Sequence, residues 1–234
     1  ARRVRELEPK GVTISIGGEI GEVGKQNSTV EELRAYLDGF EAAKGAITGV
    51  SKVSVQTGTT HGGVPMADGR VADVKLDFGT LEELSRCCRE EYGLAGAVQH
   101  GASTLPDELF GRFPETETAE IHLATGFQNI VFDHPRFPRD LRDDMNEWLR
   151  QNAQEENKPG YTDEQFLFKA RKKAWGPYKQ ACCDLPEDVA QAIDADLEAK
   201  FAFYIERLGV AGSAAVVEKH VRAADFAYAR PPGL

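Results

Sequence analysis

Polar side chains that can bind a metal ion recur in the first half of the chain. They are Glu19 in Gly-Gly-Glu-Ile-Gly, His61 in Thr-Thr-His-Gly-Gly and His100 in Gln-His-Gly-Ala-Ser. Neutral imidazole suits a borderline metal such as zinc, and the glycine after each histidine lets a substrate approach the backbone closely. The pattern predicts that His61 and His100 bind a metal. A hydrogen-bonded core or surface histidine is the alternative for either residue.

A short segment directly after His100 is suited to holding a phosphate. Gly101 and Ser103 offer backbone N–H groups and a hydroxyl at a point that leads into a helix N-terminus. Gly62-Gly63 is placed to contribute in the same way after the first histidine. Taken alone, the segment is equally typical of an ordinary turn between a strand and a helix, so its value comes from its position beside His100.

The segments that must position these residues alternate between two kinds up to about residue 130. Short β-branched runs alternate with stretches of helical period, which is typical of βα units around a parallel sheet. Strands are predicted at Val12–Ile16, Lys52–Gln56, Gly96–Gln99 and Glu120–Ala124. In a parallel βα barrel the carboxyl ends of the strands share one face, and catalysis is found on that face. Glu19, the two histidines and Thr125 are therefore expected to converge there.

Start signals mark the helices between these strands. Ser28-x-x-Glu31 and Thr80-x-x-Glu83 have the pattern of capping boxes and predict the starts of the first two helices. The third helix is expected to begin near Leu105–Asp107, because proline is tolerated in a first turn and acidic residues suit the positive helix end.

The chain beyond about Asp140 shows no further strand pattern. Amphipathic helices separated by Pro or Gly are predicted at Asp140–Gln154, Thr162–Cys183, Pro186–Leu208 and Ser213–Tyr228. A closed (β/α)8 barrel needs eight strands and typically about 250 residues, so four strands amount to half of one. The predicted fold is α/β: the C-terminal half of a TIM (β/α)8 barrel over residues 1–135, followed by a helical C-terminal extension over residues 136–234. Because the chain opens without Met on a basic stub, we expect its partner to be a missing N-terminal barrel half.

Composition excludes several classes of partner. The 234 residues carry a formal net charge of −10, which offers no uniform basic field for nucleic acid or anionic lipid. No apolar run approaches the roughly 20 residues that span a bilayer, so we expect a cytoplasmic protein without membrane contact. The four cysteines form two adjacent pairs, Cys87-Cys88 and Cys182-Cys183, and are expected to be reduced thiols in helices.

Four runs of the sequence lie between residues 11 and 130 in a specific order. They are Gly-Glu-Ile-Gly, Thr-Gly-Thr-Thr-His-Gly-Gly, Val-Gln-His-Gly-Ala-Ser-Thr-Leu-Pro-Asp-Glu and Glu-Ile-His-Leu-Ala-Thr-Gly. In this order they resemble the second half of class II fructose-bisphosphate aldolases. The resemblance implies that His61 and His100 are two of three histidines that hold a catalytic Zn²⁺. It also implies that Glu19 is a carboxylate beside the metal, which becomes a ligand in some states.

The resemblance further implies a substrate site. The family's glycines and serine around the ketose phosphate match Gly62, Gly101 and Ser103, and a threonine of its final strand matches Thr125. A monovalent cation near the phosphate is also expected. The family places a basic residue of its tail against the second phosphate, and Lys169 is the candidate here, although a solvated basic helix face is the alternative for that cluster.

The sequence departs from the family pattern at the last strand. His122 and Ala124 stand where the family usually has asparagine and aspartate, so contacts to the reacting part of the substrate must differ. The family's general base, an aspartate beside the first zinc histidine, would belong to the missing half. His122 is a candidate acid-base group, and a strand histidine that is simply hydrogen-bonded is the alternative.

The resemblance implies a zinc-dependent aldolase that cleaves a ketose phosphate such as fructose 1,6-bisphosphate to dihydroxyacetone phosphate and an aldehyde. We expect a cytoplasmic, homo-oligomeric enzyme of carbohydrate metabolism, with a dimer and a glycolytic role as the simplest form. Two alternatives remain at this point: a metal-dependent sugar-phosphate isomerase or epimerase, because enediolate chemistry serves both, and a non-catalytic aldolase-like binding protein.

Overall fold

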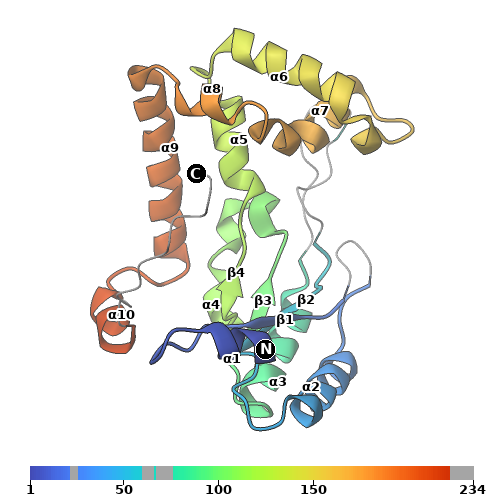
Figure 1. Cartoon of the computed structure of the whole chain (residues 1–234), viewed down its shortest axis with the longest axis vertical. Coiled ribbons are helices and arrows are strands. Elements are labelled where there is room, and N and C mark those ends of the chain that lie inside the picture. Colours follow the sequence, from blue (N-terminus) through green and yellow to red (C-terminus); the bar gives the residue numbers. More distant parts are fainter. Residues whose placement is uncertain (22–25, 60–65, 67–75, 222–234) are drawn as a thin grey trace.

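The computed structural model describes residues 1–21, 26–59, 66 and 76–221. Its strands are β1 (Gly17–Glu19), β2 (Lys52–Val55), β3 (Ala97–Gln99) and β4 (Glu120–Ile121). They form one parallel sheet in the order β1-β2-β3-β4. The helices α2 (Val30–Lys44) and α3 (Phe78–Glu90) connect the first three strands, as βα units require (Figure 1). The predicted α/β class with a partial barrel is confirmed.

The first strand lies later in the chain than predicted. The β-branched run Val12–Ile16 precedes β1, and the ladder starts where the Ile16 carbonyl accepts from the Ser51 N–H at 2.8 Å. The register then pairs Gly17 with Lys52. The segment that leads into β2 turns at residues 45–47 and joins the sheet only at Ser51. The β-branched run therefore has no strand of the described chain beside it.

The fourth strand is shorter than the predicted Glu120–Ala124. The His122 N–H still donates to the Gln99 carbonyl at 2.9 Å, but β3 ends at Gln99. The chain after β4 then enters α5 (Thr125–Asp133), a helix that the sequence analysis did not predict. His122 therefore follows the strand and does not lie within it.

Side chains alternate between the two faces of this sheet. Val53, Val55 and Ala97 are buried on the face covered by α2 and α3. Gly18 lies on the same face, and a Cβ there would stand 2.5 Å from the hydroxyl oxygen of Tyr36, so glycine allows α2 to pack closely. The opposite face, called the polar face below, carries the residues Glu19, Lys52, Ser54, Val98 and Glu120 at matching register positions.

The cap of α2 is displaced from the predicted box by one residue. Thr29 is the N-cap: its hydroxyl accepts from the Glu32 N–H at 3.2 Å, and the Glu32 carboxylate accepts from the Thr29 N–H at 2.9 Å. Ser28 is instead buried against Gln56, and the Gln56 N–H donates to its hydroxyl at 3.0 Å. The Ser28 hydroxyl, which the sequence pattern predicts as a helix cap, therefore accepts a tertiary hydrogen bond from Gln56 instead.

The cap of α3 also differs from the prediction. Asp77 precedes the helix, and its carboxylate accepts from the Thr80 N–H at 3.0 Å and from the Thr80 hydroxyl at 2.8 Å. Thr80 is thus the third residue of the helix rather than its cap. An aspartate at this position also interacts favourably with the positive end of the helix dipole.

Replacing Asp77 by alanine should lower the free energy of unfolding by about 1 kcal/mol near neutral pH. Hydrogen bonds from the N–H and hydroxyl of Thr80 lower the pKa of Asp77 from its ordinary value. The stabilisation is therefore present above the unfolded-state pKa of about 4 and is lost as the pH falls through the lower folded-state value. Urea unfolding near neutral pH and at about pH 2 measures this. An equal difference at both pH values would contradict a carboxylate cap, and Asp194→Ala on the exposed side of a later helix is the control.

The C-terminal part of the chain is helical, as predicted. The elements that follow α5 are α6 (Arg139–Asn152), α7 (Asp163–Ala170), α8 (Lys179–Cys183), α9 (Glu187–Arg207) and α10 (Ala214–His220). The predicted helix Thr162–Cys183 is divided: α7 passes into a 3-10 helix at Arg171–Trp175, and Gly176-Pro177 separates that helix from α8, since proline cannot continue a helical hydrogen-bond ladder. The end of the predicted Ser213–Tyr228 helix lies outside the described residues. Within the described residues, no helix has the length and apolarity to cross a bilayer.

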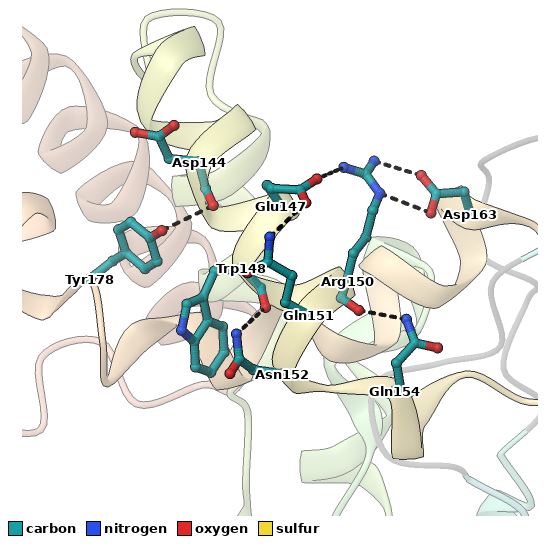
Figure 2. Close-up of polar contacts among 9 residues, drawn as sticks. All are labelled: Asp144, Glu147, Trp148, Arg150, Gln151, Asn152, Gln154, Asp163 and Tyr178. Atoms are coloured by element: carbon teal, nitrogen blue, oxygen red, sulfur yellow. Dashed lines mark hydrogen bonds and ion pairs between the residues drawn. The ribbon is translucent and has the colours of Figure 1, made fainter.

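Polar contacts join α6 to the elements that follow it (Figure 2). The Arg150 guanidinium donates to both carboxylate oxygens of Asp163 on α7, at 2.7 and 3.2 Å. The Tyr178 hydroxyl donates to the Asp144 carbonyl oxygen at 3.0 Å. Both contacts reach across the helical extension, and together they hold α7 and the segment before α8 against α6.

Two apolar clusters form the interior. One contains the covered sheet face, α3 and the aromatic rings of Phe110 and Phe113. The other joins the end of α5 to α6, α7 and α9. Helix α9 contributes Tyr204 to the first cluster and Ile193 to the second, and it lies beside α5 (Figure 1). The predicted boundary near residue 135 falls between α5 and α6, and the division into two domains stays a prediction.

The four cysteines have free thiols. Cys87 and Cys88 are buried on α3, and burial raises the pKa of Cys88 to about 12. That thiol is therefore protonated and unreactive near neutral pH.

Candidate functional site

A buried glutamine holds the loops that follow β2 and β3. The fully buried Gln99 amide accepts from the Thr57 hydroxyl at 2.6 Å and donates to the Thr59 hydroxyl at 3.0 Å. It also donates to the His100 carbonyl oxygen at 2.6 Å, and the Thr59 hydroxyl donates to the same oxygen at 2.7 Å. Because these buried polar groups satisfy one another, the backbone of His100 is fixed relative to the loop after β2.

A second buried glutamine closes the turn after β2. The side-chain oxygen of Gln56 accepts from the N–H groups of Thr57 at 2.8 Å and Gly58 at 3.1 Å. Its amide nitrogen donates to the Thr59 carbonyl oxygen at 3.2 Å. The turn is thus held from inside the protein, directly before the segment that contains His61.

Two imidazoles meet beyond the ends of β3 and β4. The ring centroids of His100 and His122 are 4.2 Å apart, with 45° between the ring planes. His100 is partly buried, whereas 48% of the His122 side chain is exposed. The structure therefore brings together two histidines that are separated in sequence by the whole β3–β4 connection.

An ion pair on the polar face, between Lys52 and Glu120, contacts His122. The Glu120 carboxylate bonds to the Lys52 ammonium group through one oxygen and to Nε2 of His122 through the other. Burial raises the pKa of Glu120, but the hydrogen bonds from Lys52 and His122 outweigh it and lower that pKa below its ordinary value. The glutamate is therefore ionised near neutral pH, and both of its partners are donors.

The segment after β3 makes a tight turn toward α5. Gly101 has φ of 76°, in the left-handed region that favours glycine. The Ala124 N–H donates to the Ser103 hydroxyl oxygen at 3.0 Å, and a Cβ at Gly126 would stand 3.0 Å from the Ser103 carbonyl oxygen. Gly101, Ser103 and the first turn of α5, which begins at Thr125, therefore lie together. Their proposed role in binding phosphate stays a prediction.

The other proposed metal ligands are placed only in part. Glu19 is exposed at the end of β1, on the polar face and in register with Ser54. The backbones of β1 and β3 are two strand spacings apart, about 10 Å. The Glu19 carboxylate and the His100 imidazole could therefore meet only if both side chains extend toward each other. His61 and Gly62 lie outside the described residues.

Lys169 lies in the helical extension, on α7, and is partly buried. Burial lowers the pKa of Lys169, and the charges of Lys158 and Lys172 lower it further, while Glu156 opposes them. The proposed role of Lys169 at a phosphate stays a prediction.

The described residues could supply only part of the ligand set of a zinc site. They contain no group of three histidine, cysteine, aspartate or glutamate side chains arranged to hold a metal. His100 nevertheless has one property of a ligand: a backbone held by buried hydrogen bonds, which orders its imidazole as metal ligands require. The remaining proposed ligands are Glu19, at the end of β1, and His61, which lies outside the described residues.

The sequence analysis missed the residues that support these histidines. Gln56 and Gln99 were considered only as strand ends, and Lys52 and Glu120 only as strand starts. A signal was present, because lysine and glutamate are depleted in strands and a glutamine ends both central predicted strands. The partners of Lys52 and the threonine partners of Gln99 could not be inferred, since these contacts join segments that follow or form different strands.

Comparisons with known proteins bear on the family and on the fold of the chain. A protein-family model described as fructose-bisphosphate aldolase class-II matches residues 3–182. Among solved structures, the fructuronate-tagaturonate epimerase UxaE from Cohnella laeviribosi is similar, with a TM-score of 0.53 and 11% sequence identity. The match covers 88% of this chain and 48% of that one. At this identity the likeness bears on the fold alone.

Two further structures match with lower TM-scores. One, designated a fructose-1,6-biphosphate aldolase from Coccidioides immitis, has a TM-score of 0.36 and 17% identity over 80% of this chain and 55% of that one. The other, designated a tagatose 6 phosphate kinase from Sinorhizobium meliloti 1021, has a TM-score of 0.45 and 18% identity over 81% and 52%. The chain thus spans about half the length of these structures.

Proposed function

Since the chain belongs to the class II fructose-bisphosphate aldolase family, we propose that it forms the metal and phosphate end of a zinc-dependent aldolase. The reaction is cleavage of a ketose phosphate such as fructose 1,6-bisphosphate to dihydroxyacetone phosphate and an aldehyde. The observation that carries this proposal is the joined arrangement of His100, Gly101, Ser103 and the start of α5. A metal ligand beside a phosphate cradle suits a substrate whose carbonyl group is close to a phosphate.

His61 and His100 are proposed to hold the zinc, with Glu19 as a carboxylate ligand in some states. A third histidine would come from the remaining part of the barrel. The chemistry that zinc supplies when bound is polarisation of the substrate carbonyl group. The contribution of the described chain is to hold the His100 imidazole in place, because the Gln99 amide anchors its backbone.

The phosphate cradle is proposed to consist of Gly62, Gly101, Ser103 and Thr125, with Lys169 at a second phosphate. Backbone N–H groups at the start of a helix and a serine hydroxyl are good donors to phosphate oxygens. A monovalent cation near this phosphate would balance part of its charge.

Cleavage also needs groups that move protons. The hydroxyl beside the breaking carbon–carbon bond must lose its proton, and its carbon becomes the aldehyde carbonyl. The bonding electrons move to the ketose fragment, which is then protonated. Glu19 and His122 are the proposed acid-base groups of this chain, and an aspartate of the remaining barrel half is the proposed further base.

The whole protein is proposed to contain the other barrel half, to form a homo-oligomer such as a dimer, and to work in the cytoplasm in carbohydrate metabolism. The net charge of −10 disfavours a polyanion such as nucleic acid, and the proposed phosphate cradle is a local site for a small substrate.

The test is a product analysis of the full-length protein with zinc and fructose 1,6-bisphosphate. Dihydroxyacetone phosphate and an aldehyde in equal amounts would support the proposal. Recovery of an isomeric sugar phosphate would replace it with an isomerase or epimerase activity. Bound substrate without turnover, measured calorimetrically on the zinc-loaded protein, would replace it with a binding function.

Replacing Ser103 by aspartate is expected to raise KM for the bisphosphate about tenfold, because a carboxylate would repel the substrate phosphate. The fold should survive, since aspartate keeps an oxygen that can accept from the Ala124 N–H. Steady-state kinetics measure KM, and Ser213→Asp at the N-cap of α10 is the matched control. An unchanged KM in Ser103→Asp would place the phosphate elsewhere.

A further inference from the structure

The ion pair between Lys52 and Glu120 on the polar face is hydrogen-bonded to the imidazole of His122. The Glu120 carboxylate divides its oxygens between two partners, Oε2 toward Lys52 and Oε1 toward Nε2 of His122. Lys52 comes from β2 and Glu120 from β4, so the contact spans β3. Both side chains are partly withdrawn from water, and such pairs contribute little to stability because of the cost of desolvation. The role of this ion pair is therefore better explained by its orientation of the His122 imidazole than by a contribution to stability.

The contact determines which nitrogen of His122 carries hydrogen. An ionised carboxylate can only accept, so Nε2 must be the donor. Neutral imidazole carries one hydrogen, which leaves Nδ1 with a lone pair. Within the part of the chain that the structure describes, Nδ1 makes no recorded hydrogen bond.

A second contact restrains the same ring. The His122 ring packs against the His100 ring with centroids 4.2 Å apart. A hydrogen bond at one nitrogen and a ring contact on one face together restrict rotation about both side-chain torsions. The imidazole is thereby held beside the proposed metal ligand while its Nδ1 stays available to another molecule.

We propose that Glu120, anchored by Lys52, is the positioning residue that sets the tautomer and ring orientation of His122, so that Nδ1 accepts a hydrogen bond from a substrate hydroxyl. This inference rests on the proposed function, in which His122 contacts the reacting part of the sugar phosphate. It also names a specificity element: an acceptor at this position favours a substrate with a hydroxyl there and disfavours an analogue that lacks one.

The decisive variant is Glu120→Gln, which keeps the size of the side chain. The Lys52 ammonium group can only donate, so the amide oxygen should turn to Lys52 and the amide NH2 to His122. A donor facing Nε2 moves the ring hydrogen to Nδ1 and removes the acceptor. The double variant Lys52→Met with Glu120→Gln frees the amide oxygen to face His122 and should restore the original tautomer.

The measurement is ¹⁵N–¹H correlation on the histidine-labelled full-length protein, with the His122 signals identified from a His122→Asn sample. The parent should carry hydrogen on Nε2, Glu120→Gln on Nδ1, and the double variant again on Nε2. The value of kcat should fall about 10- to 100-fold in Glu120→Gln and recover in part in the double variant. Asp163→Asn, which removes a carboxylate partner of Arg150 on the extension, is the matched control and should change neither readout.

The two arms of the experiment judge different claims. Hydrogen on Nδ1 in the parent, or a tautomer that Glu120→Gln does not change, overturns the positioning role whatever the activity is. A parent that lacks cleavage activity overturns the proposed function, while the tautomer still decides the inference. An active parent whose kcat survives the tautomer change in Glu120→Gln shows that the orientation of His122 does not matter for turnover.

Discussion

Replacing His100 by alanine should lower kcat for ketose bisphosphate cleavage by roughly a thousandfold, or about 4 kcal/mol in the barrier. The reason is the loss of one imidazole from a catalytic zinc site, which usually has three protein ligands. The surrounding loop should stay in place, because the bonds from Gln99 and Thr59 go to the His100 carbonyl oxygen and not to its side chain. Zinc per chain should fall together with kcat.

The measurement is zinc content by atomic absorption after gel filtration, alongside steady-state kinetics and thermal unfolding of the apo protein. His220→Ala, at an exposed histidine near the end of α10, is the control and should behave like the parent. Full zinc content and full activity in His100→Ala would remove His100 from the site. A large fall in apo-protein stability would indicate a structural effect instead.

Replacing Gln99 by leucine should lower the free energy of unfolding by about 3 kcal/mol, because buried polar groups lose their partners. Leucine fills a similar volume but leaves the Thr57 hydroxyl without its acceptor and removes a donor from the His100 carbonyl. Gln99 is fully buried, so water cannot replace these bonds without opening the core. The loosened loop should also weaken zinc binding, since it holds His100.

Urea unfolding checks this prediction, with an unchanged m-value required for the comparison. The matched control is Gln191→Leu, at an exposed glutamine on α9 whose amide donates to Glu187 four residues earlier, and its change should stay within about 0.5 kcal/mol. A Gln99→Leu protein as stable as the parent would mean that the amide network contributes no net stability.

Local patterns were informative where local chemistry decides the structure. The alternation of β-branched and helical segments predicted a parallel sheet of four strands, which the structure contains, and the family resemblance agreed with it. The element ends were less accurate. Ser28 has the residue type of a cap but is used by Gln56, and the run Val12–Ile16 has strand character without a strand beside it in the described chain. In both cases a contact distant in sequence outweighed a local preference.

The sequence by itself determined where His100 lies, because strand direction places a residue directly after a parallel strand at the shared edge of the sheet. His100 directly follows β3, and Ser103 lies four residues beyond the end of that strand. Only the tertiary structure decided how these groups are oriented, since Lys52 and Glu120 lie 68 residues apart and meet through strand order and register. A periodic pattern gives the face to which each side chain points. It carries no information about which side chain stands opposite, and that pairing sets the orientation of His122.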